Sequence, residues 1–344
     1  MTSIEMGTLL TDFSASRITT LGHCGRKFKY HYVDKVPRGA VSSALIVGSI
    51  MHDGMEAWFR AGDHQDQPLW PHVQTAWDVW LEGQGELAAA MHAHRLAAAE
   101  AAELAEMIHF KRPDLKNPTG TKEYLSSPQA KQVSDAVAGV LEVVQAQEDQ
   151  VQWAKDELPH VVFEKTRAWS ASAEQVFAPL AAPLAVELPF QAEIAGYRIQ
   201  GRIDQLRIDP NEQGEAITSV LDYKTSRNPL SPMLAALQSI IYAEATRQSP
   251  ELPTADRVAF YLVRTGTWQP ARVDPDRHLP LIERIVRERA AMIEHELYAP
   301  SYGMWCDRCE FRDMCAAELD LWLGAGVRDS HLADLTQDPQ EADQ

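Results

Sequence analysis

The chain has 344 residues, of which 45% are hydrophobic and 24% charged, a composition typical of a globular protein with a sizeable core. Its net charge of −17 excludes a protein whose whole surface binds nucleic acid. The sequence contains no run of about 18 apolar residues, so no membrane helix is expected. The acidic start MTSIEMGTLLTDF is not typical of a signal peptide. We therefore expect a cytoplasmic protein, in which clustered cysteines more often bind metal than form disulfides.

Charge is distributed unevenly along the chain. Residues 12–40 hold six basic and two acidic side chains, whereas residues 329–344 hold five acids and no base, which predicts a disordered tail. The basic stretch could hold single-stranded DNA by charge and stacking, or its aromatic rings could be core beneath a solvated basic face. The residues concerned are Arg26, Lys27, Lys29, Phe28, Tyr30 and Tyr32.

The first half of the chain predicts helices. A short helix is expected within residues 14–36 and another over 49–60. The stretch 70–110 is rich in Ala, Glu and Leu, which is helical composition. A loop with Pro and Gly over 111–125 interrupts it, and a further helix is expected over 128–156.

After Leu158 the pattern changes to an alternation of polar and apolar residues, which predicts strands. Strands are expected at 160–170, at 184–195, and over GYRIQGRIDQLRID and ITSVLDYKTS, with a hairpin turn at PNEQGE. A helix over 232–247, a hairpin at Thr265-Gly266 and a helix over 279–297 complete an αβββαβ-like core. We predict a mixed α/β (α+β) fold in one domain over 1–328, with a helical portion (49–156), a sheet core (158–298), a cysteine loop (299–320) and the tail 329–344.

Two neighbouring strands carry the candidate catalytic residues. Asp204 lies within GYRIQGRIDQLRID, and Asp222 and Lys224 lie two apart on the next strand, so both point to one face. If the strands pair through PNEQGE, Asp204 lies beside Asp222, and adjacent carboxylates repel unless a cation lies between them. Such oxygen ligands suit Mg²⁺ or Mn²⁺, and Lys224 would activate water or stabilise charge. The alternative is a solvated strand face.

Three residues of the predicted helices can join this pair. Gln238 and Tyr242 are four apart on the helix that follows the D-x-K strand, so they share one helical face. His52, in the helix over 49–60, offers a nitrogen ligand for a metal ion. Taken alone, each is explained as well by a helix surface or by a structural histidine.

All four cysteines fit one further site. Cys306, Cys309 and Cys315 form the pattern C-x2-C-x5-C, and Cys24 lies 282 positions before the first of them. Four thiolates are a complete ligand set for a [4Fe–4S] cluster or a structural zinc ion. Their spacing leaves both open, although zinc sites more often consist of two C-x2-C pairs.

In order, His52, Asp204, Asp222-x-Lys224 and Gln238-x3-Tyr242 resemble the PD-(D/E)xK nuclease superfamily, in particular its RecB-like and Cas4-like branch. One cysteine before the core and three after it resemble the iron–sulfur nucleases of the Cas4, AddB and Dna2 type, and SASRITTLGHCGRKFKYHYV resembles their first helix and first cysteine. The resemblance spans about residues 12–318. Gly25 departs from it, because many relatives have proline after the first cysteine.

The resemblance implies a restriction-endonuclease-like αβββαβ core with a large N-terminal helical insertion and a [4Fe–4S] staple. It assigns roles as follows: metal ligands His52, Asp204, Asp222 and the Tyr223 carbonyl; catalytic lysine Lys224; residues that position DNA, Gln238 and Tyr242; and cluster ligands Cys24, Cys306, Cys309 and Cys315. Glu187 and Glu193, on the preceding strand, are both candidates for a further acidic residue.

The implied function is that of an Mg²⁺- or Mn²⁺-dependent DNase, an exonuclease that prefers single strands or DNA ends and leaves 5′-phosphates. Its context would be recombination, repair, phage DNA metabolism or CRISPR adaptation, with a helicase or CRISPR integrase as partner and no membrane. No G-x4-G-K-[ST] motif occurs, so no helicase motor is expected within the chain. The alternatives are an inactive AddB-like DNA-binding or scaffold module and a zinc-binding structural protein.

Overall fold

The computed structural model describes residues 13–37, 41–148, 150–153, 157–211, 213–271, 274–303, 305–306 and 309–323. The chain divides into two compact units. Among the described residues, the first unit comprises 16–37 together with those from Arg287 onward, and the second comprises 13–15 and 41–286. The prediction of one domain over 1–328 stays a prediction.

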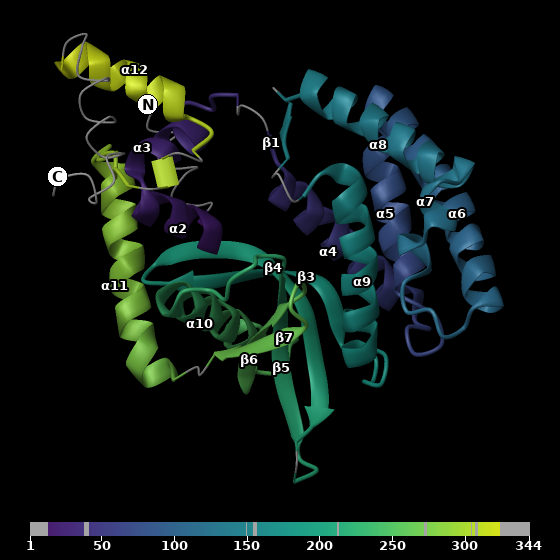
Figure 1. The fold of residues 1–344 in the computed structure, drawn as a ribbon. Coiled ribbons are helices and arrows are strands. Elements are labelled where there is room, and N and C mark those ends of the chain that lie inside the picture. Colours follow the sequence, from purple (N-terminus) through teal and green to yellow (C-terminus); the bar gives the residue numbers. More distant parts are fainter. Residues whose placement is uncertain are drawn as a thin grey trace, which may run out of the picture. The chain divides into compact units, whose positions relative to one another are not determined.

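The second unit contains a five-stranded mixed sheet with the order β3-β4-β5-β6-β7 (Figure 1). Neighbouring strands are antiparallel except β5 and β6, which are parallel and joined by helix α10. A parallel pair needs such a crossover connection, whereas the antiparallel pairs are joined by tight turns. The bounds are β3 Ala185–Ile194, β4 Tyr197–Pro210, β5 Ala216–Lys224, α10 Pro232–Gln248, β6 Arg257–Leu262 and β7 Thr267–Ala271.

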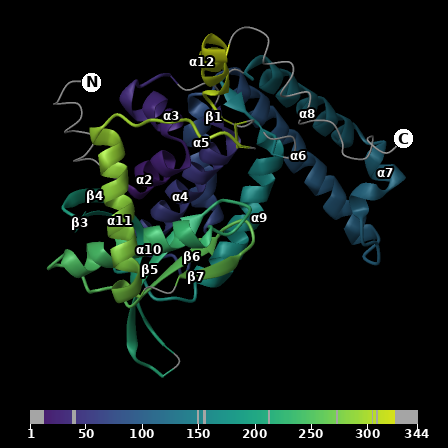
Figure 2. The same cartoon turned by 90° about the vertical axis from the view of Figure 1, so that its left-hand side faces the viewer.

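Helices form most of the rest of this unit. Strands β1 (Val41–Ser42) and β2 (Val151–Gln152) pair in parallel, so the helical excursion leaves and returns at one place. Within it, α6 and α8 lie side by side (Figure 2). The bounds are α4 Ser43–Ala61, α5 Trp70–Glu82, α6 Glu86–Lys111, a 3₁₀ turn Pro118–Gly120, α7 Lys122–Leu125, α8 Pro128–Ala146 and, after β2, α9 Pro159–Phe177.

The strand predicted at 160–170 is wrong, because this segment lies within helix α9. Its buried positions include Val162, Thr166, Ser170 and Phe177, whose spacings of four and seven residues are helical. Pro159 occupies the first turn, where a missing N–H costs nothing. A few alternating polar and apolar residues at the start of the segment led to the strand prediction, although the longer segment has a helical period. The helix predicted over 128–156 likewise ends at Ala146.

One hydrophobic core joins the helices to the sheet. Trp58 of α4 and Trp77 of α5 are fully buried, and the same cluster includes Leu221 and Tyr223 of β5. The indole Nε1 of Trp77 donates a hydrogen bond to Thr166 Oγ1 at 2.9 Å, so the polar atom of this ring is satisfied. The core therefore holds α4 against the strand that carries the D-x-K motif.

The first unit brings together two segments from opposite ends of the sequence. Helix α2 (Ala15–His23), α3 (Gly25–Phe28) and a π-turn (Lys29–Val33) pack with α12 (Arg312–Leu323) and the last part of α11 (Pro275–Glu294). A Cβ at Gly25 would lie 2.8 Å from the carbonyl oxygen of Ala299. Close backbone approach thus requires glycine where many relatives have proline.

None of the helices in the described part of the chain combines the length and the apolar composition that a membrane span requires.

Candidate active site

Strands β4 and β5 place two aspartates face to face. Their register pairs Gln205 with Leu221, so Asp204 and Asp222 stand at opposite positions one step further on. Both are almost completely buried, with 6% and 3% of their surfaces exposed. Asp204 Oδ2 accepts a hydrogen bond of 2.6 Å from the backbone N–H of Tyr223, which fixes its side chain across the strand pair.

The two oxygens of Asp222 have different partners. Oδ1 accepts a hydrogen bond of 2.5 Å from the hydroxyl of Tyr242 on α10. Oδ2 lies 2.5 Å from Lys224 Nζ and forms an ion pair with it. Among the described residues Oδ2 accepts no hydrogen bond. Period-2 alternation on β5 brings Asp222 and Lys224 to one face, and the crossover helix brings Tyr242 over it.

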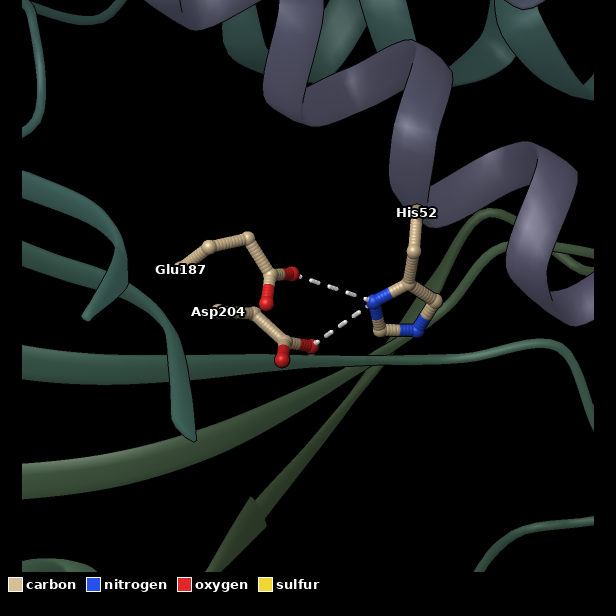
Figure 3. Close-up of side chains that lie close together, drawn as sticks. All are labelled: His52, Glu187 and Asp204. Carbon is tan, nitrogen blue, oxygen red and sulfur yellow. Dashed lines mark ion pairs between the residues drawn. The ribbon is translucent and has the colours of Figure 1, made fainter. Parts of the chain in front are cut away.

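His52 reaches the same place from helix α4. Its Nδ1 lies 3.5 Å from Glu187 Oε1 and 3.6 Å from Asp204 Oδ2, as the dashed lines of Figure 3 show. Its Nε2 lies 3.1 Å from the carbonyl oxygen of Tyr223. Ligand atoms of His52, Glu187 and Asp204 all lie within 4.8 Å of one another.

Of the two glutamates on β3, the structure brings Glu187 into this group. Val186 and Leu188 pair with Gln205 and Ile203, so Glu187 stands opposite Asp204 on the neighbouring strand. Its φ of +48° lies in the left-handed region that residues with a Cβ seldom adopt. Glu193 is exposed, and its backbone N–H donates to Gln248 Oε1.

The carboxylates and the histidine perturb one another strongly. Burial and the neighbouring Asp222 raise the pKa of Asp204 to about 7, although His52, the Tyr223 N–H and Lys224 oppose the shift. Burial alone would lower the pKa of His52, but Glu187, Asp204 and Asp222 outweigh it and raise it to about 9. The metal-free site therefore keeps extra protons at neutral pH, as expected where negative groups crowd without a cation.

The donors present fit a divalent cation. Buried carboxylate oxygens with one imidazole nitrogen suit Mn²⁺ or Mg²⁺ better than soft metals. A cation would replace the protons that the site otherwise holds. His52, Glu187 and Asp204 hold ligand atoms within 4.8 Å of one another, and Asp222 stands opposite Asp204 beside this group.

Gln238 lies on α10 one turn before Tyr242 and is half-buried. Its Oε1 is buried and has no hydrogen-bond partner among the described residues. A buried acceptor left unpaired costs about 1–3 kcal/mol, so it is a candidate contact for a ligand.

The four cysteines all lie in the first unit. Cys24 precedes α3, and its Sγ accepts the backbone N–H groups of Lys27 and Ser301, each at 3.5 Å. Burial and the neighbouring Cys24, Cys306 and Cys309 raise the pKa of Cys315. The fold therefore brings Cys24 to the C-x2-C-x5-C segment.

The basic and aromatic side chains that follow Cys24 contact other residues of the same unit. Phe28 and Tyr30 are core residues, 1% and 2% exposed, so their rings are not available to stack on bases. The interpretation as core aromatics holds for these two residues. The three basic side chains form ion pairs: Arg26 with Glu318, Lys27 with Glu310, and Lys29 with Asp34.

One group of residues beside the site was missed by the sequence patterns. The carboxylate of Glu157, just before α9, is 3% exposed and binds Arg264 and Arg227. Arg264 also donates to the carbonyl of Thr225, the residue after Lys224. No local spacing reveals this group, because Glu157, Arg227 and Arg264 are 37 to 107 positions apart.

The sheet carries two facing aspartates and a lysine, and a helix brings a histidine beside them. This arrangement is consistent with a restriction-endonuclease-like core. Residues 12–126 and 119–316 match the family described as the PD-(D/E)XK nuclease superfamily. The chain belongs to this superfamily, whose members are nucleases that use divalent metals.

Among curated proteins no match is found. Among solved structures, one titled "Crystal structure of SSO0001" is 15% identical, with a TM-score of 0.29. The match covers 55% of this chain and 80% of that one. A likeness of this size carries no argument about function.

Proposed function

We propose that this nuclease is an Mg²⁺- or Mn²⁺-dependent DNase of the RecB-like and Cas4-like branch, an exonuclease that prefers single-stranded DNA or DNA ends and leaves 5′-phosphates. The observation that carries the proposal is the facing pair Asp204 and Asp222, with Lys224 Nζ 2.5 Å from Asp222 Oδ2. Carboxylates that could hold a metal ion, with a cationic side chain beside them, support metal-assisted hydrolysis of a phosphodiester.

The metal would be held by His52, Glu187, Asp204 and Asp222, with the Tyr223 carbonyl as a further oxygen. Tyr223 O lies 3.1 Å from His52 Nε2, so this carbonyl would also orient the ring whose Nδ1 faces Glu187 and Asp204. When bound, a divalent cation supplies positive charge to the scissile phosphate and lowers the pKa of a nearby water.

Residues of the chain would also position the DNA and stabilise charge on its phosphate. Lys224, with 21% of its side chain exposed, can reach the substrate and stabilise the charge that develops on the phosphate oxygens. The hydroxyl of Tyr242 donates to Asp222 Oδ1, and burial together with Asp222 raises the pKa of Tyr242 well above its ordinary value, so it stays a donor. Gln238, one turn before Tyr242 on α10, would help to position the DNA.

We propose further that Cys24, Cys306, Cys309 and Cys315 bind a [4Fe–4S] cluster as a structural staple. The split of one cysteine before the core and three after it, instead of two C-x2-C pairs, supports the cluster over a zinc ion. The hydrogen bond from the backbone N–H of Ser301 to Cys24 Sγ supports a site that Cys24 shares with the C-terminal cysteine segment.

The substrate would be DNA, met in the cytoplasm during recombination, repair, phage DNA metabolism or CRISPR adaptation, with a helicase or a CRISPR integrase as partner. A catalytically inactive AddB-like scaffold is the second candidate. The presence of His52, Asp204, Asp222 and Lys224 in one site favours the enzyme.

The test is cleavage of end-labelled single- and double-stranded DNA with Mg²⁺ or Mn²⁺. Asp222→Ala and Lys224→Ala should each lower the rate at least a hundredfold, because each removes a group at the reacting phosphate. Lys131→Ala, which removes an exposed lysine of α8, is the matched control and should cleave normally. Normal cleavage by Asp222→Ala or Lys224→Ala would contradict the assignment, and an inactive wild type would favour the scaffold.

A further inference from the structure

An open groove lies along the paired strands β3 and β4. Its volume is about 440 Å³, which is within the range of sites that bind small organic groups. Neighbouring residues of both strands line it, and the register places them opposite one another: Pro189, Phe190 and Gln191 of β3, and Arg202, Gly201 and Gln200 of β4. The groove is therefore built from the same two strands that carry Glu187 and Asp204.

Two contacts connect this groove to the candidate active site. Arg202 Nη1 lies 3.8 Å from Glu187 Oε2. The ring of Phe190 packs edge-on against the ring of Tyr242, with ring centres 5.7 Å apart, and the Tyr242 hydroxyl donates to Asp222 Oδ1. A group held in the groove would therefore lie beside the residues that would bind the metal.

Apolar groups form part of the lining. Phe190 packs closely over Gly201, since a Cβ at position 201 would come within 2.9 Å of the ring. Glycine thus allows the ring to lie against the backbone of β4. Pro189 adds a second apolar side chain to the groove. An aromatic and apolar lining suits a nucleobase, because every base has an apolar face.

The polar groups of the lining suit the rest of a nucleotide. The side chain of Arg202 is 64% exposed, and its long ion pair with Glu187 contributes little stability, so the guanidinium can turn to a phosphate. Gln191 and Gln200 carry amides, which can both donate and accept hydrogen bonds at the edge of a base. The six lining residues include no acid, although the chain has a net charge of −17, and this favours an anionic ligand.

We propose that this groove binds one unpaired nucleotide of the DNA next to the scissile phosphate, with its base against Phe190 and its phosphate on Arg202. The proposal rests on the nuclease function proposed above and deepens it. A base can enter the groove only when it is not stacked and paired in a double helix. The groove therefore accounts for a preference for single strands or frayed DNA ends.

Binding of a fluorescein-labelled single-stranded oligonucleotide without divalent metal, measured by fluorescence anisotropy, tests the groove apart from cleavage. Arg202→Ala should raise the Kd about tenfold, because a charge-assisted contact with a phosphate is lost. Arg198→Ala is the matched control, since it removes an exposed arginine of the same strand that does not line the groove. Wild-type affinity in Arg202→Ala, or an equal loss in Arg198→Ala, would overturn the proposal.

A second measurement changes the substrate instead of the protein. Oligonucleotides that each lack one base, at successive positions from either end, are compared as substrates with Mn²⁺. Wild type should show a kcat/KM about fivefold lower or less for one of them, because the contact between a base and an aromatic ring is lost. Phe190→Leu should lose most of this difference, whereas Phe110→Leu, which removes an exposed ring of α6, should keep it. Equal kcat/KM for all the oligonucleotides with wild type would overturn the proposal.

The results separate the groove from the nuclease function. A wild type that cleaves DNA but depends neither on Arg202 nor on any single base contradicts the groove alone. A wild type that cleaves no DNA contradicts the proposed function. If that protein still binds the strand through Arg202, the groove is part of a DNA-binding scaffold, and if its affinity does not depend on Arg202, both proposals fail.

Discussion

Glu187 and Glu193 lie six positions apart on one strand, so a regular strand would point both to the same face. About 20 Å of strand separates them, however, and only Glu187 stands opposite Asp204. Its carboxylate oxygen Oε1 lies 3.5 Å from His52 Nδ1, and its φ is positive. The register of β3 against β4 thus decides which acid joins the site.

Glu187→Gln should weaken Mn²⁺ binding about tenfold or more and slow cleavage, because one carboxylate of the ligand group is lost. Isothermal titration with Mn²⁺ and the cleavage assay measure the two effects. Glu193→Gln is the matched control on the same strand. If the two variants behave alike, Glu187 has no part in metal binding.

Asp204→Asn should stabilise the metal-free protein at pH 8 while removing activity. Because the pKa of Asp204 is raised to about 7 in the folded protein, the native state binds more protons than the unfolded state between about pH 4 and pH 7. Wild-type stability therefore falls as pH rises through this window. The shift corresponds to about 2–4 kcal/mol.

Urea unfolding of the metal-free proteins measures this effect. The two proteins should have similar stability at pH 4, and the variant should become the more stable one by pH 8. Mn²⁺ should reverse the order at pH 8, since it binds the wild-type carboxylate. A variant less stable than metal-free wild type at pH 8 would show that Asp204 contributes through its ionised form.

At the scale of elements, Glu157 connects the parts that hold the site. Its carboxylate accepts a hydrogen bond from Ser43 at the start of α4, the helix of His52. It also binds Arg264, which donates to the carbonyl that follows Lys224. Burial would raise the pKa of Glu157, but the hydrogen bonds from Arg264 and Arg227 lower it.

Glu157→Gln should destabilise the protein by roughly 3 kcal/mol at pH 7, because it leaves the half-buried Arg264 without its counter-charge. Since the folded pKa is lowered, this stabilisation is present above about pH 4.5 and is lost as pH falls through the folded pKa. Urea unfolding at pH 7 and below pH 4 tests both parts.

The matched control is Glu123→Gln, which breaks the exposed ion pair with Arg112 and should change stability by less than about 1 kcal/mol at either pH. A loss for Glu157→Gln no larger than that of the control would show that the buried carboxylate does not organise these elements.

At the scale of the whole molecule, segments from opposite ends of the sequence build one compact unit, and the nuclease core lies between them in the sequence. Cys24 and Cys306 are 282 positions apart. A cross-link that closes such a loop lowers the entropy of the unfolded chain, which stabilises the folded state by about 5 kcal/mol. A cluster on the four cysteines would therefore act on global stability.

Cys24→Ala should lose the brown colour of anaerobically purified protein and lower its Tm, because the cluster loses a ligand and the loop is no longer closed. The absorbance spectrum and the thermal unfolding curve are the measurements. Trp305→Phe, a conservative change in the same segment, should keep the colour. A colourless wild type that contains zinc would favour the zinc alternative, and an unchanged Cys24→Ala would show that Cys24 is not a ligand.

The sequence predicted correctly those strands and shared faces that have a regular alternation of polar and apolar residues. The hairpin of β4 and β5 and the shared face of Asp222 and Lys224 follow from period-2 alternation and a clear turn. Helix α9 could not be predicted, because a few alternating residues near its start imitate a strand. The choice of Glu187 depends on the register of β3 against β4, and the Glu157 group depends on contacts over long separations, which no local pattern records.

The site draws His52 from the helical half and its carboxylates from the sheet, and these residues are far apart in the order of synthesis. A nascent chain that has emerged as far as Asp204 still lacks Asp222 and Lys224. Since the proposed ligands meet only when β5 has paired and α4 has packed against it, an incomplete or unfolded chain cannot concentrate the metal. On the proposed assignment, cleavage therefore requires the complete fold of the second unit.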